Sequence, residues 1–391
     1  MSKRFRSIAT CFSVAAALHV APAQAQDAYV VGVSGAMTGP VAAGYAPIVE
    51  SMKAYLDHVN SNGGVNGKPI RLIVLDDQAQ PSRAATNAKQ LILQDRVILV
   101  VNTSLSSTYA PMVAESKRAG TPLFYAGGVC PPATYPPADA LQFCSTAYSA
   151  NLDSEAALAF IKSSAKGPVR IGFAGMAIPM VRTGIEHAEK VAAQLGMKTV
   201  GTQYSPPPAP DYTPFATKLK ESDPNWVFSW SPWLSEVRTF EALRRLGWDG
   251  RYLTWAHFQA EEELARIKDG AFYVIGTNAF LEDSLPVHAE MRAVAHRAKL
   301  QYPLSYLTEG YVAGMVLEAA LKKTPWPPTP KSVAAAMSNL KVDLRGLRGG
   351  PLEWTKENHF RTAQYYRVWR WDPAQGRIVR VQDWHKIETK R

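Results

Sequence analysis

The sequence predicts an α/β protein of two doubly wound lobes, each a parallel sheet covered by helices. Three observations predict this fold. Strand-like apolar segments alternate with amphipathic helix-like segments along almost the whole chain, the pattern of βαβ units. The alternation occurs as two successive series, the second of which begins near Tyr148. The chain has 391 residues, too many for one ordinary core and about right for two domains.

The first series runs from residue 29 to residue 128. The segment YVVGVS predicts a strand, and apolar residues at helical spacing from Pro47 predict the helix after it. The segment NGGVNGKP ends that helix. VILVVN, at 97–102, is apolar enough to be buried on both faces, as strands of parallel sheets are. The other predicted elements are a strand at 70–77, helices at 81–93 and 106–120, and a strand at 122–128.

The second series repeats this alternation and ends in a hairpin. In the tail, DPAQG lies between aromatic and β-branched runs, which predicts a hairpin over 364–384. Before it, the segment AFYVIGTNAF leads into two helices at 286–302 and 308–323. The earlier elements are strands at 169–175, 199–205, 225–231 and 251–257, and helices at 181–196, 212–222 and 235–247.

In doubly wound folds, ligands bind outside the carboxyl ends of the strands. This rule selects the strand-to-helix loops, which contain many small residues and tryptophans but few charges. The loops are GAMTGPVAAGY, NTSLSST, YAGGVC, AGMAIPMV, SWSPWLS and TWAHFQA.

Residues 1–25 have the pattern of a secretory signal peptide. Lys3, Arg4 and Arg6 precede an apolar stretch that ends in the cleavage-site pattern AQA at 23–25. We expect cleavage there and a periplasmic protein; the alternative is a short buried helix. Removing these three basic residues lowers the formal net charge from +10 to +7. Because the remaining excess is spread along the chain, nucleic acid is not an expected partner.

Two cysteines remain once Cys11 is removed with this segment. In an oxidising compartment, Cys130 and Cys144 predict one disulfide that closes the proline-rich loop CPPATYPPADALQFC. A metal site is the alternative, but no His or Cys lies at ligand spacing nearby.

The motifs of the common catalytic and nucleotide-binding sites do not occur in the sequence. The GK pair at 67–68 is followed by proline, so there is no Walker loop, and G-x-G-x-x-G, G-x-S-x-G and H-E-x-x-H are also missing. Asp76 and Asp77 point to opposite faces of a strand, so they do not form a catalytic pair. The glutamates at 261–263 suit the first turn of a helix. We therefore predict no enzyme activity and no cofactor.

Four segments carry a family resemblance: VVGVSGAMTGPVAAGY, AYLDHVNSNGGVNGKPIRLIVLDDQAQPSRAATNAKQLI, SSTYAPMVAESKRAGTPLFY and WVFSWSPWLSEVRTFEALRRLGWDG. In these segments, and in the order of its elements, the chain resembles the type I periplasmic binding proteins of the branched-chain amino acid (leucine-binding) group of ABC importers. The resemblance implies two Rossmann-like lobes joined by a three-strand hinge. Residues 26–147 and 276–350 would form one lobe, and 148–275 and 351–391 the other.

The resemblance also implies how such a protein works and where its first lobe holds a ligand. A monomer closes on a small molecule, and membrane permease subunits recognise the closed form. In the family, backbone N–H groups at a helix start and in a neighbouring loop hold the ligand's carboxylate, because orphan N–H groups and the helix dipole favour an anion. These contacts fall on Ser104, Leu105, Ser106, Ser107, Gly127, Gly128 and Val129.

The second lobe departs from the family pattern. Amino-acid binders place an acid in the loop matching TWAHFQA to pair with the α-ammonium, but Ala256 and His257 stand there. Burying an ammonium without a counter-charge costs several kcal/mol. The departure therefore argues for a carboxylate ligand with an apolar or aromatic body and no ammonium.

Six residues are expected around the body of such a ligand. Tyr45, Met180, Trp230 and Trp233 would pack on its body, and His257 or Arg182 would bond a polar substituent. The alternatives are that Trp230 is a core residue, that Arg182 is solvated, and that Tyr45 packs only on its own lobe.

We therefore expect the periplasmic binding component of an ABC importer, with an aromatic or aliphatic carboxylate as its ligand. One alternative is a branched-chain amino acid binder whose ammonium meets a differently placed acid. Another is a sensor domain that acts in trans, and a periplasmic enzyme is the third.

Overall fold

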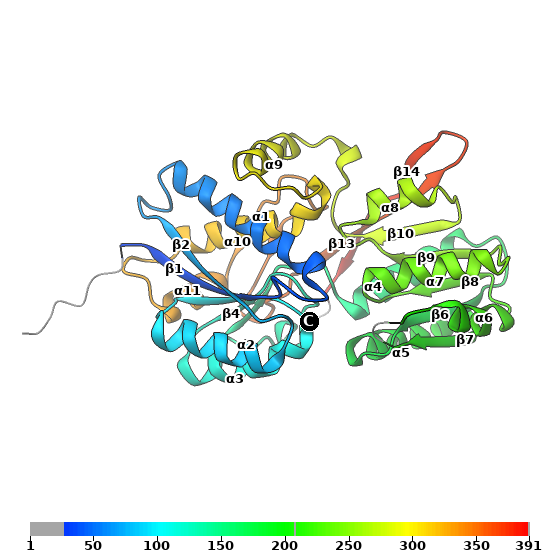
Figure 1. Ribbon diagram of the computed structural model, residues 1–391, viewed down its shortest axis with the longest axis horizontal. Coiled ribbons are helices and arrows are strands. Elements are labelled where there is room, and N and C mark those ends of the chain that lie inside the picture. Colours follow the sequence, from blue (N-terminus) through cyan, green and yellow to red (C-terminus); the bar gives the residue numbers. More distant parts are fainter. Residues whose placement is uncertain (1–26, 207–208, 390–391) are drawn as a thin grey trace, which may run out of the picture.

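The computed structural model describes residues 27–206 and 209–389, which form two lobes side by side (Figure 1). Each lobe contains one main sheet with helices packed on it, so the predicted class of two doubly wound α/β lobes is confirmed. The expected signal peptide at 1–25 lies outside the described residues. No helix within the described ranges is long and apolar enough to cross a membrane.

The first lobe is built on a five-stranded sheet in which all neighbouring strands are parallel. Its strands, from edge to edge, are β2 (Ile70–Asp76), β1 (Tyr29–Gly35), β3 (Leu99–Thr103), β4 (Leu123–Tyr125) and β5 (Gln142–Cys144). Strands β1 and β3 are buried along their whole length, as the apolar segment at 97–102 predicted for β3. The sequence did not predict β5, because three residues are too few to show a period.

Helices from two separate stretches of the chain cover this sheet. They are α1 (Ala42–Ser61), α2 (Pro81–Lys89), the π-helical turn η1 (Gln90–Gln94), the 3₁₀ turn η2 (Ser106–Thr108), α3 (Tyr109–Ala119), α9 (Pro286–Arg297), the 3₁₀ turn η5 (Leu304–Leu307), α10 (Thr308–Lys322) and α11 (Pro330–Met337). A Cβ on Gly310 would lie 2.1 Å from the Ile48 carbonyl oxygen, and one on Gly314 would lie 2.5 Å from the Tyr55 ring. These two glycines let α10 pack directly on α1, far apart in the sequence, in the core of the lobe.

Helix α1 begins at Ala42, earlier than the sequence predicted. Pro47 therefore lies inside the helix instead of at its start, and it removes one backbone hydrogen bond. The additional first turn consists of small residues that show no apolar period. Tertiary packing supports it, because the Phe258 ring of the second lobe lies 3.8 Å from where a Cβ of Gly44 would be.

The second lobe is built on a seven-stranded mixed sheet. Its strands, from edge to edge, are β14 (Arg377–Glu388), β13 (Ala363–Asp372), β10 (Phe272–Gly276), β9 (Arg251–Trp255), β8 (Trp226–Ser229), β6 (Arg170–Met176) and β7 (Lys198–Ser205). The predicted C-terminal hairpin is confirmed as β13 and β14, which pair antiparallel around a turn that ends at Gly376 with φ of +62°.

Helices cover both faces of this second sheet. They are α4 (Ala150–Ser164), α5 (Pro179–Gln194), α6 (Thr213–Glu221), α7 (Trp233–Arg245) and α8 (Ala260–Ile267). The sequence did not predict α4, although its start carries a readable signal. Ser149 caps the helix by accepting from the Leu152 N–H at 3.4 Å, and Asp153 accepts from the Ser149 N–H at 3.0 Å.

The chain passes between the lobes three times, after β5, after β10 and before β13. Between the last two crossings lie the short strands β11 (Lys341–Val342) and β12 (Leu352–Glu353). Leu352 and Trp354 pack in the core of the first lobe, whereas the sequence assigned residues from 351 onward to the second. We infer that the first lobe comprises about 27–147 and 277–361, and the second about 148–276 and 362–389.

Candidate functional site

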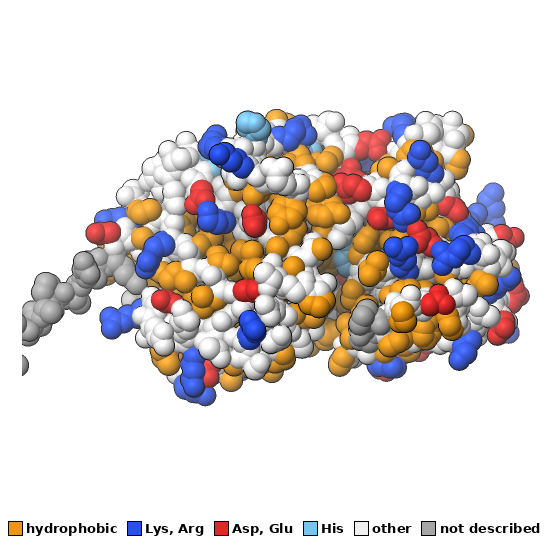
Figure 2. Space-filling view, in the orientation of Figure 1, with side chains coloured by type: hydrophobic (Ala, Val, Ile, Leu, Met, Phe, Trp, Pro, Cys, Tyr) orange, Lys and Arg blue, Asp and Glu red, His pale blue; other side chains and the backbone are white. Residues whose placement is uncertain are grey.

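The loops after the strands of both lobes meet at the boundary between them (Figure 1). Phe258, which follows β9, packs edge-on against Tyr306 of the first lobe with ring centroids 4.9 Å apart. Ser305 of η5 donates a hydrogen bond of 2.7 Å to Glu262 of α8. On the face shown in Figure 2, hydrophobic side chains gather on the first lobe beside this boundary, and charges of both signs are interspersed over the second.

Asp76, at the end of β2, holds the first-lobe loop GAMTGP in place. Its carboxylate accepts hydrogen bonds from the N–H groups of Met37 (3.0 Å) and Thr38 (3.3 Å) and from the Thr38 hydroxyl (2.5 Å). Burial raises the pKa of Asp76, but these bonds and one from Gln78 N–H outweigh it, so the pKa lies below its ordinary value. The loop N–H groups thus serve a protein carboxylate, which excludes the phosphate-binding role that glycine-rich loops often have.

The next residue, Asp77, is completely buried and ties together the strand ends of the first lobe. It accepts from the Ser34 hydroxyl at 2.8 Å, the Ser104 hydroxyl at 2.7 Å and the Ala79 N–H at 2.8 Å. Ser104 is also fully buried. Its side chain, expected from the sequence to face a ligand, is therefore engaged in a network inside the lobe.

Leu105, Ser106 and Ser107 lie at the start of a helix, as the resemblance implied. Leu105 has extended backbone, and the turn η2 begins at Ser106 and runs directly into α3. Ser107 is exposed, and Leu105 and Ser106 are half-buried. The N–H groups of this first turn point away from the helix, where an anion can accept from them.

The loop of Gly127, Gly128 and Val129 packs against that helix start. A Cβ on Gly128 would lie 2.9 Å from the Ser104 carbonyl oxygen and 2.2 Å from the Tyr109 hydroxyl. Tyr109 donates a hydrogen bond of 2.9 Å to the Val129 carbonyl oxygen. The structure thus brings the two predicted first-lobe loops side by side, at a separation that only glycine permits.

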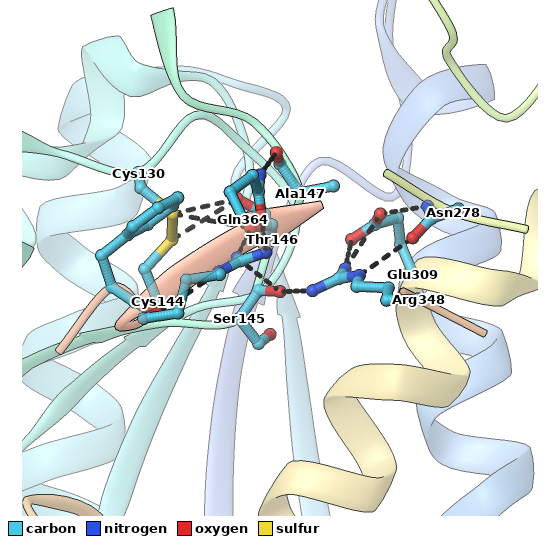
Figure 3. Close-up of polar contacts among 11 residues, drawn as sticks. Cys130, Cys144, Ser145, Thr146, Ala147, Asn278, Glu309, Arg348 and Gln364 are labelled. Carbon is cyan, nitrogen blue, oxygen red and sulfur yellow. Dashed lines mark hydrogen bonds and ion pairs between the residues drawn. A yellow bond between two sulfur atoms is a disulfide. The ribbon is translucent and has the colours of Figure 1, made fainter. Parts of the chain in front are cut away.

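Cys130 and Cys144 form the disulfide that the sequence favoured, with Cα atoms 5.7 Å apart. The bond joins the end of the glycine loop to the end of β5, next to the first crossing between the lobes (Figure 3). It therefore fixes the loop at 127–129 relative to the hinge.

In the second lobe, His257 is held by a buried acid that the sequence did not reveal. His257 Nε2 lies 3.0 Å from the Ser231 carbonyl oxygen and 3.2 Å from Glu236 Oε2. Because both partners are acceptors, Nε2 carries the hydrogen. Glu236 is completely buried, and its other oxygen accepts from the Ser231 N–H at 2.9 Å. Burial raises the pKa of Glu236, and the nearby His257 opposes that rise.

Aromatic rings surround His257 on the side of the hinge and on the side of α7. Tyr148, at the first crossing, has its centroid 5.6 Å from the imidazole, and Trp233 has its centroid 5.5 Å away. The Trp233 indole N–H is buried and has no hydrogen-bond partner within the described residues. Burial raises the pKa of Tyr148, and Glu309 and the Tyr45 phenol add to the rise. Tyr45 itself is half-buried in the first turn of α1.

Three other residues of the predicted ligand site are Arg182, Trp230 and Met180. Arg182 is exposed and stacks over Tyr204, with 4.3 Å between the guanidinium carbon and the ring centroid. Trp230 is 7% exposed, and its indole N–H donates to Asp153 Oδ2 at 3.0 Å. The structure therefore favours the solvated reading of Arg182 and the core reading of Trp230. Met180 is half-buried in the first turn of α5.

The described residues offer no ready catalytic or metal centre. No group of three or more His, Cys, Asp or Glu side chains in this part of the chain could hold a metal ion. The site combines backbone donors on one lobe with rings and a fixed imidazole on the other. Such an arrangement can bind an anion with an aromatic body but contains no activated nucleophile.

Comparison with known proteins gives one family match over most of the chain. The model of the family described as "Periplasmic binding protein" matches residues 28–377. An amino acid binding protein of Pseudomonas aeruginosa is 31% identical over 105 residues, which are 27% of this chain and 28% of that relative. The aligned part thus spans less than a third of the relative's length.

Solved structures with similar folds come from the same kind of protein. A solute-binding protein of an ABC transporter from Rhodopseudomonas palustris BisB5, in complex with 3,4-dihydroxybenzoic acid, has a TM-score of 0.78 at 19% identity and covers 94% of this chain and 99% of that one. A branched-chain amino acid ABC transporter protein from Thermus thermophilus with bound valine also has a TM-score of 0.78, at 18% identity, and covers 91% and 96%. At these identities the likeness establishes the fold.

Proposed function

The chain belongs to the periplasmic binding protein family, and on this premise we propose that it is the substrate-binding component of an ABC importer. It captures a small carboxylate with an aromatic or apolar body between its lobes in the periplasm. It then presents the closed form, as a monomer, to membrane permease subunits, and it performs no chemistry on the ligand.

The first lobe supplies the carboxylate's partners. The N–H groups at the start of η2 and in the loop at 127–129 lie side by side, and the glycines allow a ligand oxygen to approach the backbone. Hydrogen bonds from N–H groups to an ionised oxygen are stronger than those between neutral groups. Of the predicted set, Leu105, Ser106 and Ser107 are the contacts we retain at the helix start.

Glu236 of the second lobe is the observation that supports a ligand without an ammonium. Its carboxylate is completely buried, with one oxygen bonded to Ser231 N–H and the other beside His257. Asp77 of the first lobe is buried and bonded in the same way. Glu236 Oε2 has no hydrogen-bond partner within the described residues but lies 3.2 Å from His257 Nε2, and Asp77 makes its contacts inside the first lobe. An ammonium would have to displace His257 to reach a carboxylate oxygen, and an unpaired buried charge costs several kcal/mol.

Tyr45, Tyr148, Trp233 and His257 supply the surface for the ligand's body. Aromatic pairs contribute about 0.5–1.5 kcal/mol each beyond the area they bury. We propose that His257, held by Glu236, bonds an oxygen substituent on the ring opposite the carboxylate. Related folds with bound hydroxybenzoates fit this choice, since one from Rhodopseudomonas palustris holds 4-hydroxybenzoate.

Amino acid binding is the second candidate, and Glu236 is also the observation that favours it. If His257 rotated away, the buried carboxylate would become available to an ammonium at the same place. The relative from Pseudomonas aeruginosa bears the name of an amino acid binding protein.

A thermal-shift screen over aromatic acids, aliphatic acids and amino acids tests the proposal. A ligand that binds only the folded form raises the melting temperature as it saturates the site. We expect shifts from hydroxybenzoates and related acids and none from leucine or valine. Shifts from amino acids alone would overturn the choice of ligand and support the second candidate.

A further inference from the structure

A small cavity lies where the crossings between the lobes come together. Thr277 follows β10, Arg348 and Arg361 precede the last crossing, and Gln364 follows it; all four line this cavity. Its volume is about 10 Å³, which is the room that one water-sized particle needs. The cavity is separate from the ligand site and independent of the ligand's identity.

From this position Arg348 bonds to residues beside the first and second crossings and to Glu309 of α10 (Figure 3). Its Nη1 donates to the Ser145 carbonyl oxygen at 2.6 Å, and its Nε donates to Asn278 Oδ1 at 2.9 Å. Its Nη2 donates to both oxygens of Glu309, at 3.0 and 3.2 Å. These bonds use four of the five N–H groups of a guanidinium, so one on Nη1 has no partner within the described residues.

Arg361 is 3% exposed, and no carboxylate is among its hydrogen-bond partners in the described ranges. It donates to Gln364 Oε1 at 2.6 Å, to the Thr146 carbonyl oxygen, and more weakly to Ser145 and Phe360 carbonyl oxygens at 3.4 Å. One N–H of its Nη1 is likewise left over. Burial and the neighbouring Arg348 lower the pKa of Arg361 to about 9, which reports how unfavourable the unpaired charge is there.

Thr277 adds a third donor to the cavity wall. The residue is 1% exposed, and its hydroxyl has no hydrogen-bond partner within the described part of the chain. A buried hydroxyl without a partner is uncommon and costs free energy unless something in the cavity accepts from it. The cavity is thus lined by two guanidinium groups and an unused hydroxyl.

The charges around the cavity do not balance. Glu309 compensates Arg348, but Arg361 retains a buried positive charge with only neutral acceptors around it. Glu309 acts on Arg361 through space but is already paired with Arg348. Asp153 is also within electrostatic reach of Arg361, but its oxygens already accept from Trp230, Tyr366 and Ser149. A buried charge is stabilised by an ion of opposite sign, which neutral water does not supply.

We propose that this cavity binds a single chloride-sized anion, held by Arg348, Arg361 and the Thr277 hydroxyl. A volume of about 10 Å³ suits a monatomic anion better than sulfate or phosphate, which need the room of several water molecules. Because the bound ion contacts residues next to the second and third crossings, it stabilises the hinge on which both lobes turn.

Bromide, which replaces chloride and scatters anomalously, provides the direct test. Crystals of the wild-type protein grown in sodium bromide should show an anomalous peak between Arg348, Arg361 and Thr277. In solution, the melting temperature should rise saturably with sodium chloride when sodium gluconate keeps the ionic strength constant. Thr277→Val should raise the half-effective chloride concentration about tenfold, because one hydrogen bond to a charged group is lost.

Thr103→Val is the matched control, because Thr103 is also buried with an unpartnered hydroxyl but lies in β3 of the first lobe. It should leave the chloride dependence unchanged. A cavity that holds only water in bromide crystals, or equal melting temperatures in chloride and gluconate, would overturn the proposal. The crystal test needs no variant, so a misfolded substitution does not affect it.

Discussion

Replacing Glu236 with glutamine tests how the second lobe recognises its ligand. The substitution keeps the side-chain shape but leaves one carbonyl oxygen where the wild type has two acceptors. Those acceptors serve Ser231 N–H at 2.9 Å and His257 Nε2 at 3.2 Å. In Glu236→Gln, an amide NH₂ must therefore face one of these two donors.

The magnitude follows from the lost contact. A hydrogen bond to a charged group is worth about 1.5–3 kcal/mol, and about 1.4 kcal/mol corresponds to tenfold in affinity. The loss frees the imidazole from its fixed orientation, which matters only to a ligand that bonds to His257. We expect 4-hydroxybenzoate to bind about tenfold or more weakly to the variant, and benzoate to change by less than about threefold.

Isothermal titration of both proteins with both acids measures the difference. Glu241→Gln is the control, because Glu241 lies in the same helix but pairs with Arg238 and Arg266 at the surface. It should change neither affinity. Equal losses for the two acids, or no loss for either, would refute the role assigned to the pair. Leucine binding that disappears in Glu236→Gln would instead identify Glu236 as the partner of an ammonium.

Three further substitutions test other parts of the structure. Gly128→Ala places a Cβ 2.2 Å from the Tyr109 hydroxyl, so the loop must move, and we expect at least about a tenfold loss of carboxylate affinity by titration. Arg182→Ala removes an exposed side chain that stacks on Tyr204, so affinity should stay within about twofold. Asp153→Asn tests a pH dependence: burial raises the pKa of Asp153 from an ordinary 3.8 to about 8, so its contribution to stability is largest below pH 4 and declines as the pH rises to 8. The variant loses hydrogen bonds at every pH, but urea unfolding should show a smaller deficit at pH 8 than at pH 5.

Each of these has a matched control or a contradicting outcome. Gly167→Ala introduces a Cβ with nothing within 4 Å and should leave binding unchanged. A large loss in Arg182→Ala would return that residue to the ligand site. A deficit in Asp153→Asn that is the same at pH 5 and at pH 8 would mean that the wild-type carboxyl ionises at a lower pH than burial implies.

The elements of the fold could be predicted because their signals are local. Period-two and period-3.6 patterns, glycine stops and the DPAQG turn lie within single segments, and they predicted the hairpin and most of the helices. Helices α4 and α11 were not predicted. The start of α1 was missed because the residues at 42–44 are small and show no apolar period, and Gly44 packs against Phe258. A pattern within one segment of the sequence cannot predict a contact between that segment and the other lobe.

The site was only partly predictable, for the same physical reason. The position of the first-lobe loops at the site could be predicted from the topology, since neighbouring parallel strands end at the same edge of a sheet. Glu236 and His257 are separated by a helix and a strand, and both read as ordinary residues of their own elements. Trp230 became a core residue only through Asp153, which lies in a helix that the sequence did not reveal. The packing of the two lobes decides which side chains are in contact, and a single sequence does not show that packing.

The central claim is that the site accepts a carboxylate and rejects an α-ammonium. Isothermal titration with pairs that differ only in that group tests it most directly: 3-phenylpropanoate against phenylalanine, and 4-methylpentanoate against leucine. We predict that at least one of the acids without the ammonium binds, and that its amino acid binds at least about 100-fold more weakly, because an unpaired buried ion costs several kcal/mol. Tighter binding of phenylalanine or leucine than of its partner would contradict the account.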